Sequence, residues 1–153
     1  DLHIYINSYL YKFLMPDTKK ILFVCVENAG RSQMAEGFFH KYCPAGYEPQ
    51  SAGTKPVNAV NSLAVEAMKE IGIDISTHKP KTISDSMVQH ATTIINMGCM
   101  DKESCPILFV NGSIDWSIPD PKEKSLEEIR KIRDQIDCKV KELIKTLLAG
   151  QDE

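Results

Sequence analysis

The fold of this chain follows from one stretch, Ile21-Leu22-Phe23-Val24-Cys25-Val26-Glu27-Asn28-Ala29-Gly30-Arg31-Ser32. A continuous apolar run ends at Cys25, and a short turn of Asn, Ala and Gly follows. Arg31 and Ser32 then open a segment whose apolar residues recur at helical spacing. This order is typical of a buried strand, a tight loop and the N-terminus of a helix.

Such a junction predicts a site for a tetrahedral oxyanion. Backbone N–H groups that curl around one point at the positive end of a helix dipole bind anions. We expect the anion to be bound by Val26, Glu27, Asn28, Ala29, Gly30 and Arg31. The planar guanidinium of Arg31 can hold two oxygens at once.

The thiol of Cys25 comes at the bottom of this predicted cradle. The positive field there favours the thiolate by lowering the thiol pKa, and a thiolate that faces a bound oxyanion is a nucleophile for phosphorus or arsenic. The Ser32 hydroxyl can hydrogen-bond that thiolate and help it to leave in a later step. The plainer alternative is a buried cysteine that acts as a small hydrophobe beside an ordinary turn.

Apolar patterns along the rest of the chain predict strands that alternate with helices. We expect strands at residues 20–24, 47–52, 91–97 and 113–116, and helices at residues 32–42, 58–71, 84–89 and 125–148. This alternation predicts an α/β fold of three layers, a doubly wound four-stranded parallel sheet with right-handed crossovers. Ligands of such sheets bind beyond the carboxyl ends of the strands, which is where Cys25 falls.

Composition narrows the class of protein. Hydrophobic residues make up 42% of the chain and the net charge is −3, as in ordinary globular proteins. Lys and Arg are scattered and balanced by acids, which argues against nucleic acid as a partner. No apolar run approaches the roughly 18 residues of a membrane helix. Five cysteines, an odd number, argue against a secreted disulfide framework and for a cytoplasmic location.

The chain of 153 residues fits one domain. We expect residues 15–153 to form that domain and residues 1–14 to be an N-terminal extension without a catalytic part. The alternative is that residues 1–14 add a strand or helix packed on the domain surface.

A family resemblance rests on the residues from Cys25 to Ser32 and on the Gln33-Met34-Ala35-Glu36-Gly37 that follows them. This Cys-X5-Arg segment and its continuation resemble the low-molecular-weight tyrosine phosphatase superfamily, and within it the thiol-dependent arsenate reductases. The likeness runs from about residue 19 to about residue 148. It therefore implies a low-molecular-weight phosphatase-like fold as well as a site.

Two further cysteines, Cys99 and Cys105, follow the third predicted strand in a polar segment. In the arsenate reductases that the chain resembles, a second cysteine attacks the arseno-cysteine and releases arsenite, and a third takes over the disulfide. The resemblance places these roles on Cys99 and Cys105, with thioredoxin or another thiol donor as the reducing partner. The alternatives are two inert loop cysteines, or a metal site that Cys99, Cys105, His90 and His78 would form.

Asp120 stands between two prolines after the last predicted strand. It resembles the superfamily's Asp-Pro general acid, which protonates the departing oxygen. The alternative is an aspartate that only shapes a turn. The phosphatases usually place aromatic residues directly after this pair, whereas Lys122-Glu123-Lys124 follow here, which favours a bare inorganic oxyanion. Trp116 is expected to be a half-buried residue at a strand end rather than a wall of the site.

The predicted anion-binding residues 26–31 are called the anion loop below. Asn28 is expected to shape this loop through hydrogen bonds from its side chain to the loop backbone. Some arsenate reductases bind potassium behind this loop, and Asn28, Glu36 and Ser51 match three of the four residues that they use. Lys81 stands where the fourth, an aspartate, is expected, and its ammonium group can take the place of the ion. We therefore predict no metal, no cofactor and no potassium dependence.

Three functions remain to be weighed. The favoured one is a cytoplasmic arsenate reductase that uses Cys25, Cys99 and Cys105 in sequence, with Arg31 on the substrate and Asp120 as the acid. The second is a low-molecular-weight protein tyrosine phosphatase that hydrolyses phosphomonoesters through a phosphocysteine intermediate. The third is a non-enzymatic thiol or arsenite sensor, against which the complete cradle with its arginine and acid argues.

Overall fold

The computed structural model describes residues 18–98, 103 and 112–150. The described strands are β1 Lys19–Cys25, β2 Tyr47–Gly53, β3 Ala91–Asn96 and β4 Ile114–Asp115, and the described helices are α2 Arg31–Tyr42, α3 Ser62–Lys69, α4 Asp85–His90 and α6 Leu126–Ala149. The strands pair in the order β2-β1-β3-β4, and every pair is parallel. The predicted doubly wound four-stranded parallel sheet is confirmed. Residues 1–14 lie outside the described part of the chain.

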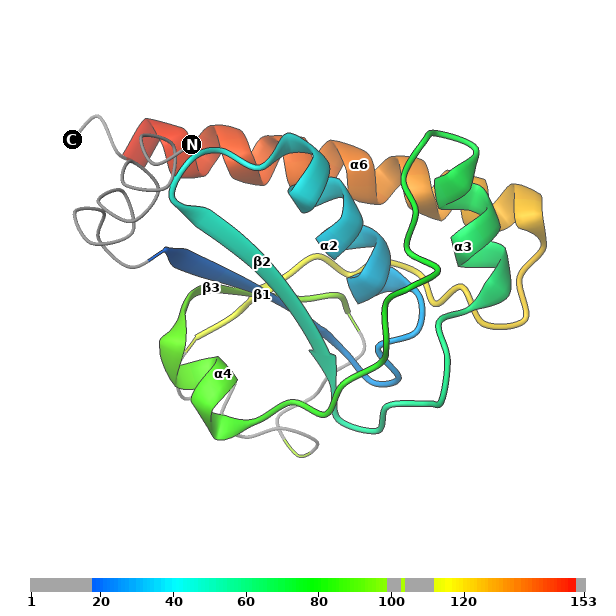
Figure 1. The fold of residues 1–153 in the computed structure, drawn as a ribbon, viewed down its shortest axis with the longest axis horizontal. Coiled ribbons are helices and arrows are strands. Elements are labelled where there is room, and N and C mark those ends of the chain that lie inside the picture. Colours follow the sequence, from blue (N-terminus) through cyan, green and yellow to red (C-terminus); the bar gives the residue numbers. More distant parts are fainter. Residues whose placement is uncertain (1–17, 99–102, 104–111, 151–153) are drawn as a thin grey trace, which may run out of the picture.

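The two faces of β1 are covered by different helices. Ile21 and Phe23 belong to a large core cluster with α2, α3 and α6, and Leu22 and Val24 belong to a smaller cluster with Val88 of α4. Figure 1 shows this three-layer arrangement, with α2, α3 and α6 on one side of the sheet and α4 on the other. All four β1 side chains have no exposed surface, because successive residues of a central strand point to opposite, covered faces.

The helix expected at residues 58–71 begins later than its apolar pattern suggests. Asn61 caps α3, since its side-chain oxygen accepts hydrogen bonds from the N–H groups of Leu63 and Ala64. The N–H of Asn61 itself donates to the carbonyl of Ala29 at 2.8 Å. The residues just before α3 therefore serve the anion loop instead of extending the helix.

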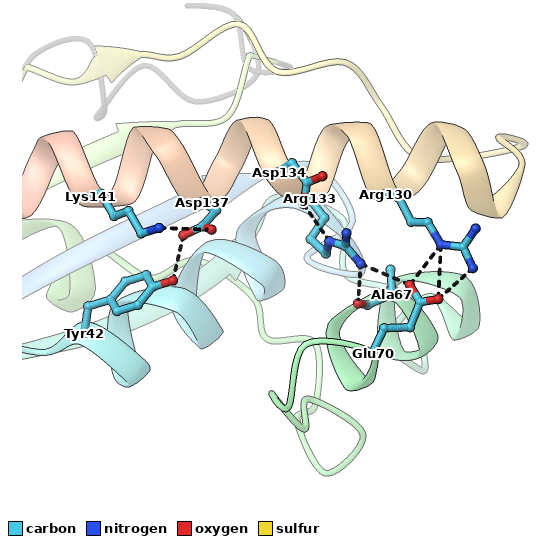
Figure 2. Close-up of polar contacts among 8 residues, drawn as sticks. All are labelled: Tyr42, Ala67, Glu70, Arg130, Arg133, Asp134, Asp137 and Lys141. Atoms are coloured by element: carbon cyan, nitrogen blue, oxygen red, sulfur yellow. Dashed lines mark hydrogen bonds and ion pairs between the residues drawn. The ribbon is translucent and has the colours of Figure 1, made fainter.

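The last helix is anchored to two others by polar contacts. The Tyr42 hydroxyl of α2 donates to Asp137 of α6 at 2.8 Å. Arg133 of α6 donates to the carbonyl of Ala67 at 2.9 Å and to the carboxylate of Glu70, which lies just beyond the end of α3, at 3.0 Å. Figure 2 shows these contacts along one side of α6. None of the helices in the described ranges, α6 included, is long and apolar enough to cross a membrane.

Candidate active site

Cys25 is the last residue of the central strand, and its side chain is almost wholly buried. Its Sγ accepts a hydrogen bond from the backbone N–H of Asn28 at 3.1 Å and lies 2.9 Å from the hydroxyl oxygen of Ser32. The thiol borders a pocket of about 200 Å³ at the carboxyl end of the sheet. The β1–α2 turn thus bends back over the sulfur, as the sequence predicted.

Asn28 holds the turn in this shape. Its backbone has φ = 52°, a left-handed conformation that asparagine tolerates better than most residues. Its side-chain oxygen accepts from the Lys81 backbone N–H at 2.9 Å and from Gln33 Nε2 at 3.0 Å, and its Nδ2 donates to Ser32 Oγ at 2.7 Å. The side chain therefore ties the loop to its surroundings, whereas the sequence suggested bonds to the loop's own backbone.

These contacts form a directed chain of hydrogen bonds from His78 to Cys25. His78 Nδ1 lies 2.9 Å from Gln33 Oε1, which can only accept, so Nδ1 donates. Gln33 then donates to Asn28, and Asn28 to Ser32. Because the Ser32 oxygen accepts from Asn28, its own proton is available for the sulfur of Cys25. The chain gives Ser32 the orientation that a thiolate needs.

Glu36 lies behind the anion loop, where it accepts from Ser51 Oγ at 3.2 Å and lies 3.3 Å from His78 Nδ1. Lys81 has an exposed side chain and reaches this region only through its backbone N–H. The interpretation that a Lys81 ammonium replaces an ion was therefore wrong, because the Lys81 side chain is exposed and the ring of His78 lies beside Glu36 instead. Within the described ranges, no group of three or more Cys, His, Asp or Glu residues is arranged to hold a metal ion.

Arg31 connects the anion loop to the segment that carries Asp120. The guanidinium is 8% exposed; its Nη1 donates to the carbonyl of Ile118 at 2.8 Å, and its Nη2 lies 3.9 Å from Asp120 Oδ2. The Asp120 side chain is 62% exposed and borders the same pocket as Cys25. The structure thus brings the predicted nucleophile, arginine and acid around one cavity.

Two glycines allow the surrounding segments to approach the loop closely. A Cβ added at Gly30 would lie 2.6 Å from Cγ of Pro121, so only glycine leaves room for the Asp120 segment to lie against the loop. A Cβ added at Gly53, at the end of β2, would overlap the carbonyl oxygen of Val26. Both positions exclude a larger residue for steric reasons.

The pocket contains most, though not all, of the residues expected from sequence. Five of the six anion-loop residues line it, while Asn28 lies behind the loop with no exposed surface. Asn61, Pro121 and Lys122 also line it without having been predicted there. Pro121 and Lys122 had a signal in the sequence, since they directly follow Asp120, whereas Asn61 had none. Trp116 packs on Phe23 in the core, with ring centroids 5.8 Å apart.

The other cysteines fall into two groups. Cys99 and Cys105, predicted to form the relay, lie outside the described residues. Cys43 is half-buried, and its thiol donates to the carbonyl of Tyr47 at 3.1 Å. Burial, helped by the charge of Glu48, raises the pKa of the Cys43 thiol, which favours its protonated form. Cys138 is exposed on α6.

A buried cysteine, an arginine and an aspartate at the carboxyl end of a doubly wound sheet define a class of proteins that handle oxyanions through a thiol. The sequence signature described as "Low molecular weight phosphotyrosine protein phosphatase" matches residues 20–152. The chain belongs to this family.

Three comparisons place the chain near arsenate reductases. It is 38% identical over 122 residues to an arsenate reductase of Staphylococcus aureus, a match that covers 78% of this chain and 92% of the relative. A solved arsenate reductase in the phosphate-binding state superposes with a TM-score of 0.74 at 32% identity, covering 84% of this chain and 98% of that one. A thioredoxin-dependent arsenate reductase of Corynebacterium glutamicum gives a TM-score of 0.74 at 29% identity. This match covers 96% of this chain and 70% of that one.

Proposed function

We propose that this protein is an arsenate reductase that converts arsenate to arsenite through the thiolate of Cys25. The observation that carries the proposal is the environment of Cys25 Sγ, which accepts from Asn28 N–H and contacts Ser32 Oγ beside a pocket that Arg31 and Asp120 line. Hydrogen bonds of this kind favour the charged form of a thiol. The names of the relatives agree with this assignment.

Arsenate binds, in this proposal, in the pocket next to the N-terminus of α2. Arg31 is the first residue of that 12-residue helix, so the positive end of the helix dipole faces the pocket. The backbone N–H groups of residues 26–31 and the guanidinium of Arg31 bind the oxyanion. The same groups accept phosphate, because the two anions share shape and charge.

The first chemical step is an in-line attack of Cys25 on arsenic. A bond forms between sulfur and arsenic, and one arsenic–oxygen bond breaks. Asp120, in its protonated form, gives its proton to the departing oxygen, which leaves as water when that oxygen already carries a proton. Arsenic remains in the +5 state, bound to Cys25.

Reduction follows when a second thiol attacks the sulfur of Cys25. Cys99 and Cys25 then share a disulfide, and the electron pair of the sulfur–arsenic bond leaves with arsenic, which is released as arsenite in the +3 state. Cys105 attacks Cys99, which frees Cys25 as a thiolate and leaves a disulfide between Cys99 and Cys105. Thioredoxin or another thiol donor reduces this disulfide and completes the cycle.

The competing function is hydrolysis of phosphomonoesters through a phosphocysteine. It needs Cys25, Arg31 and Asp120 but no second thiol, and the description of the family favours it. The two functions therefore differ in their dependence on Cys99 and Cys105.

The test measures arsenate-dependent NADPH oxidation, coupled through thioredoxin and its reductase, beside hydrolysis of an aryl phosphate. Wild type, Cys25→Ser, Cys99→Ser and Cys105→Ser are compared, with Cys138→Ser as the matched control because that thiol is exposed on α6, which does not line the pocket. We expect Cys25→Ser to abolish both reactions. Cys99→Ser and Cys105→Ser should abolish arsenate turnover and leave aryl phosphate hydrolysis intact.

The opposite pattern rules the reductase out. If wild type does not turn over arsenate with thioredoxin or with a small thiol donor, yet hydrolyses aryl phosphate in a way that is indifferent to Cys99→Ser and Cys105→Ser, the protein is a phosphatase.

A further inference from the structure

An ion pair crosses the mouth of the pocket. Glu27 belongs to the anion loop, two residues after Cys25, and Lys122 comes two residues after Asp120. Lys122 Nζ lies 3.3 Å from Glu27 Oε1, and both residues line the pocket. Their side chains are 63% and 39% exposed, whereas Cys25 is buried, so the pair lies at the outer end of the pocket.

The backbone on each side of this ion pair is held in place. The carbonyl of Glu27 accepts from the N–H of Val57 at 3.2 Å. On the opposite side, the N–H of Lys122 donates to Asp120 Oδ1 at 2.9 Å, and Pro121 lies directly against Gly30. The two charged side chains therefore meet across a gap whose ends are fixed.

The geometry points to a role for this pair in substrate choice. We infer that the ion pair of Glu27 and Lys122 makes the site selective for inorganic oxyanions over organic phosphomonoesters, an inference that rests on the proposed function. Asp120 protonates the departing oxygen, so any organic group on that oxygen must leave the pocket past Asp120. Lys122 lies there, where its backbone N–H donates to Asp120 Oδ1 and its Nζ donates to Glu27 Oε1. Arsenate and phosphate carry no such group and need no exit.

Independent action of the two charges is the alternative to be excluded. Glu27 would then repel every dianion and Lys122 would attract every dianion, so neutralising them would change binding in opposite directions. Arsenate and an aryl phosphate carry similar charge, so each change would affect both substrates alike. If the ion pair of Glu27 and Lys122 acts as one unit, called the latch below, neutralising either residue should raise the same ratio. That ratio is the kcat/KM for aryl phosphate divided by the kcat/KM for arsenate.

The experiment compares Glu27→Gln, Lys122→Gln, the double variant of both, and the charge exchange Glu27→Lys with Lys122→Glu. Lys124→Gln is the matched control, because it removes a lysine from the same segment. We expect each single variant to raise the ratio about three- to fivefold, the scale of one partly exposed ion pair. The double variant should show the same ratio as each single variant. The charge exchange should restore the wild-type ratio, and Lys124→Gln should leave the ratio unchanged.

A ratio that stays constant in both single variants, or moves in opposite directions in them, overturns the latch. A wild type that does not turn over arsenate overturns the proposed function instead. In that case the latch is judged from the kcat/KM for aryl phosphate multiplied by the inhibition constant of inorganic phosphate, and the same pattern across the variants is required. The two failures are therefore separate results.

Discussion

In the proposed mechanism, the reactivity of Cys25 depends on the hydroxyl of Ser32. Ser32 has no exposed surface and receives a hydrogen bond from Asn28, so its own proton is free to be donated to the sulfur 2.9 Å away when Cys25 is a thiolate. A serine in an ordinary first helical turn would face solvent instead. This single orientation links the buried polar network behind the loop to the nucleophile.

Ser32→Ala should lower kcat/KM for arsenate and for aryl phosphate by about 10- to 100-fold, because hydrogen bonds to charged groups contribute about 1.5–3 kcal/mol. Without the donated bond the thiolate is less favoured, so alkylation of Cys25 by iodoacetamide should require a higher pH. The measurement is the pH midpoint of Cys25 alkylation, followed by peptide mass spectrometry. Ser62→Ala, at an exposed serine of α3, is the control. An unchanged midpoint in Ser32→Ala would contradict the orientation described.

The sequence predicted Cys25 and its cradle because the relevant residues are neighbours in the chain. The role of His78 in the network was not predictable, since it lies 45 residues after Gln33 and meets it only through the fold. The same reason explains Asn61, which reaches the anion loop from the start of another helix. Cys99 and Cys105 remain predictions from family resemblance.

At the scale of elements, the site lies where two segments meet. Cys25 stands where β1 meets the β1–α2 turn, and the segment after β4 carries Asp120. Arg31, through the carbonyl of Ile118, and Gly30, through its close approach to Pro121, hold the second segment against the first. Apolar spacing predicted the strands and helices, although α3 begins later than expected, but this close contact between segments depends on the absence of a Cβ at Gly30.

Gly30→Ala should displace Pro121 and with it Asp120, and a misplacement of about 1 Å can cost about 100-fold in rate. The loss should be larger for phenyl phosphate than for p-nitrophenyl phosphate, because a better leaving group needs the acid less. Alkylation of Cys25 should stay near the wild-type rate. Gly150→Ala is the control, since α-helical backbone and open space surround that position.

Two results would contradict this prediction. Turnover could remain at the wild-type level, which would show that Pro121 moves without consequence. Equal losses for the two esters together with slower alkylation would show that the substitution damages the anion loop itself.

At the scale of the whole molecule, α6 joins the helices that cover one face of the sheet. Glu70, at the end of α3, accepts hydrogen bonds from both Arg130 and Arg133 of α6 (Figure 2). The Arg130 hydrogen bonds are the main reason that the pKa of the Glu70 carboxyl is lowered. None of Glu70, Arg130 and Arg133 lines the pocket, so the effect of this contact belongs to stability.

Glu70→Gln should lower stability at neutral pH and have less effect in acid. Because the folded-state pKa of Glu70 is depressed, its contribution is present above the unfolded-state pKa and is lost as the pH falls through the lower folded-state value. Urea unfolding of wild type and Glu70→Gln at pH 7 and near pH 3 measures this difference. Glu142→Gln, an exposed acid near the other end of α6, is the control. If the stability difference between wild type and Glu70→Gln grew as the pH fell, the assigned direction of the Glu70 pKa shift would be contradicted.

The sheet order has a consequence for how the protein opens. β1 pairs with β2 along seven positions and also with β3, whereas β4 pairs with β3 at only two positions, at the edge of the described sheet. Local unfolding draws on the least bonded parts of a structure. Amide hydrogens of β1 should therefore exchange with deuterium only when the whole domain unfolds. Those of Trp116 and Ile118, which donate to Asn96 and Met97 at the edge of the described sheet, should exchange sooner. Exchange in that order would mean that local opening releases the segment that carries Asp120 first, while the strand that carries Cys25 stays folded.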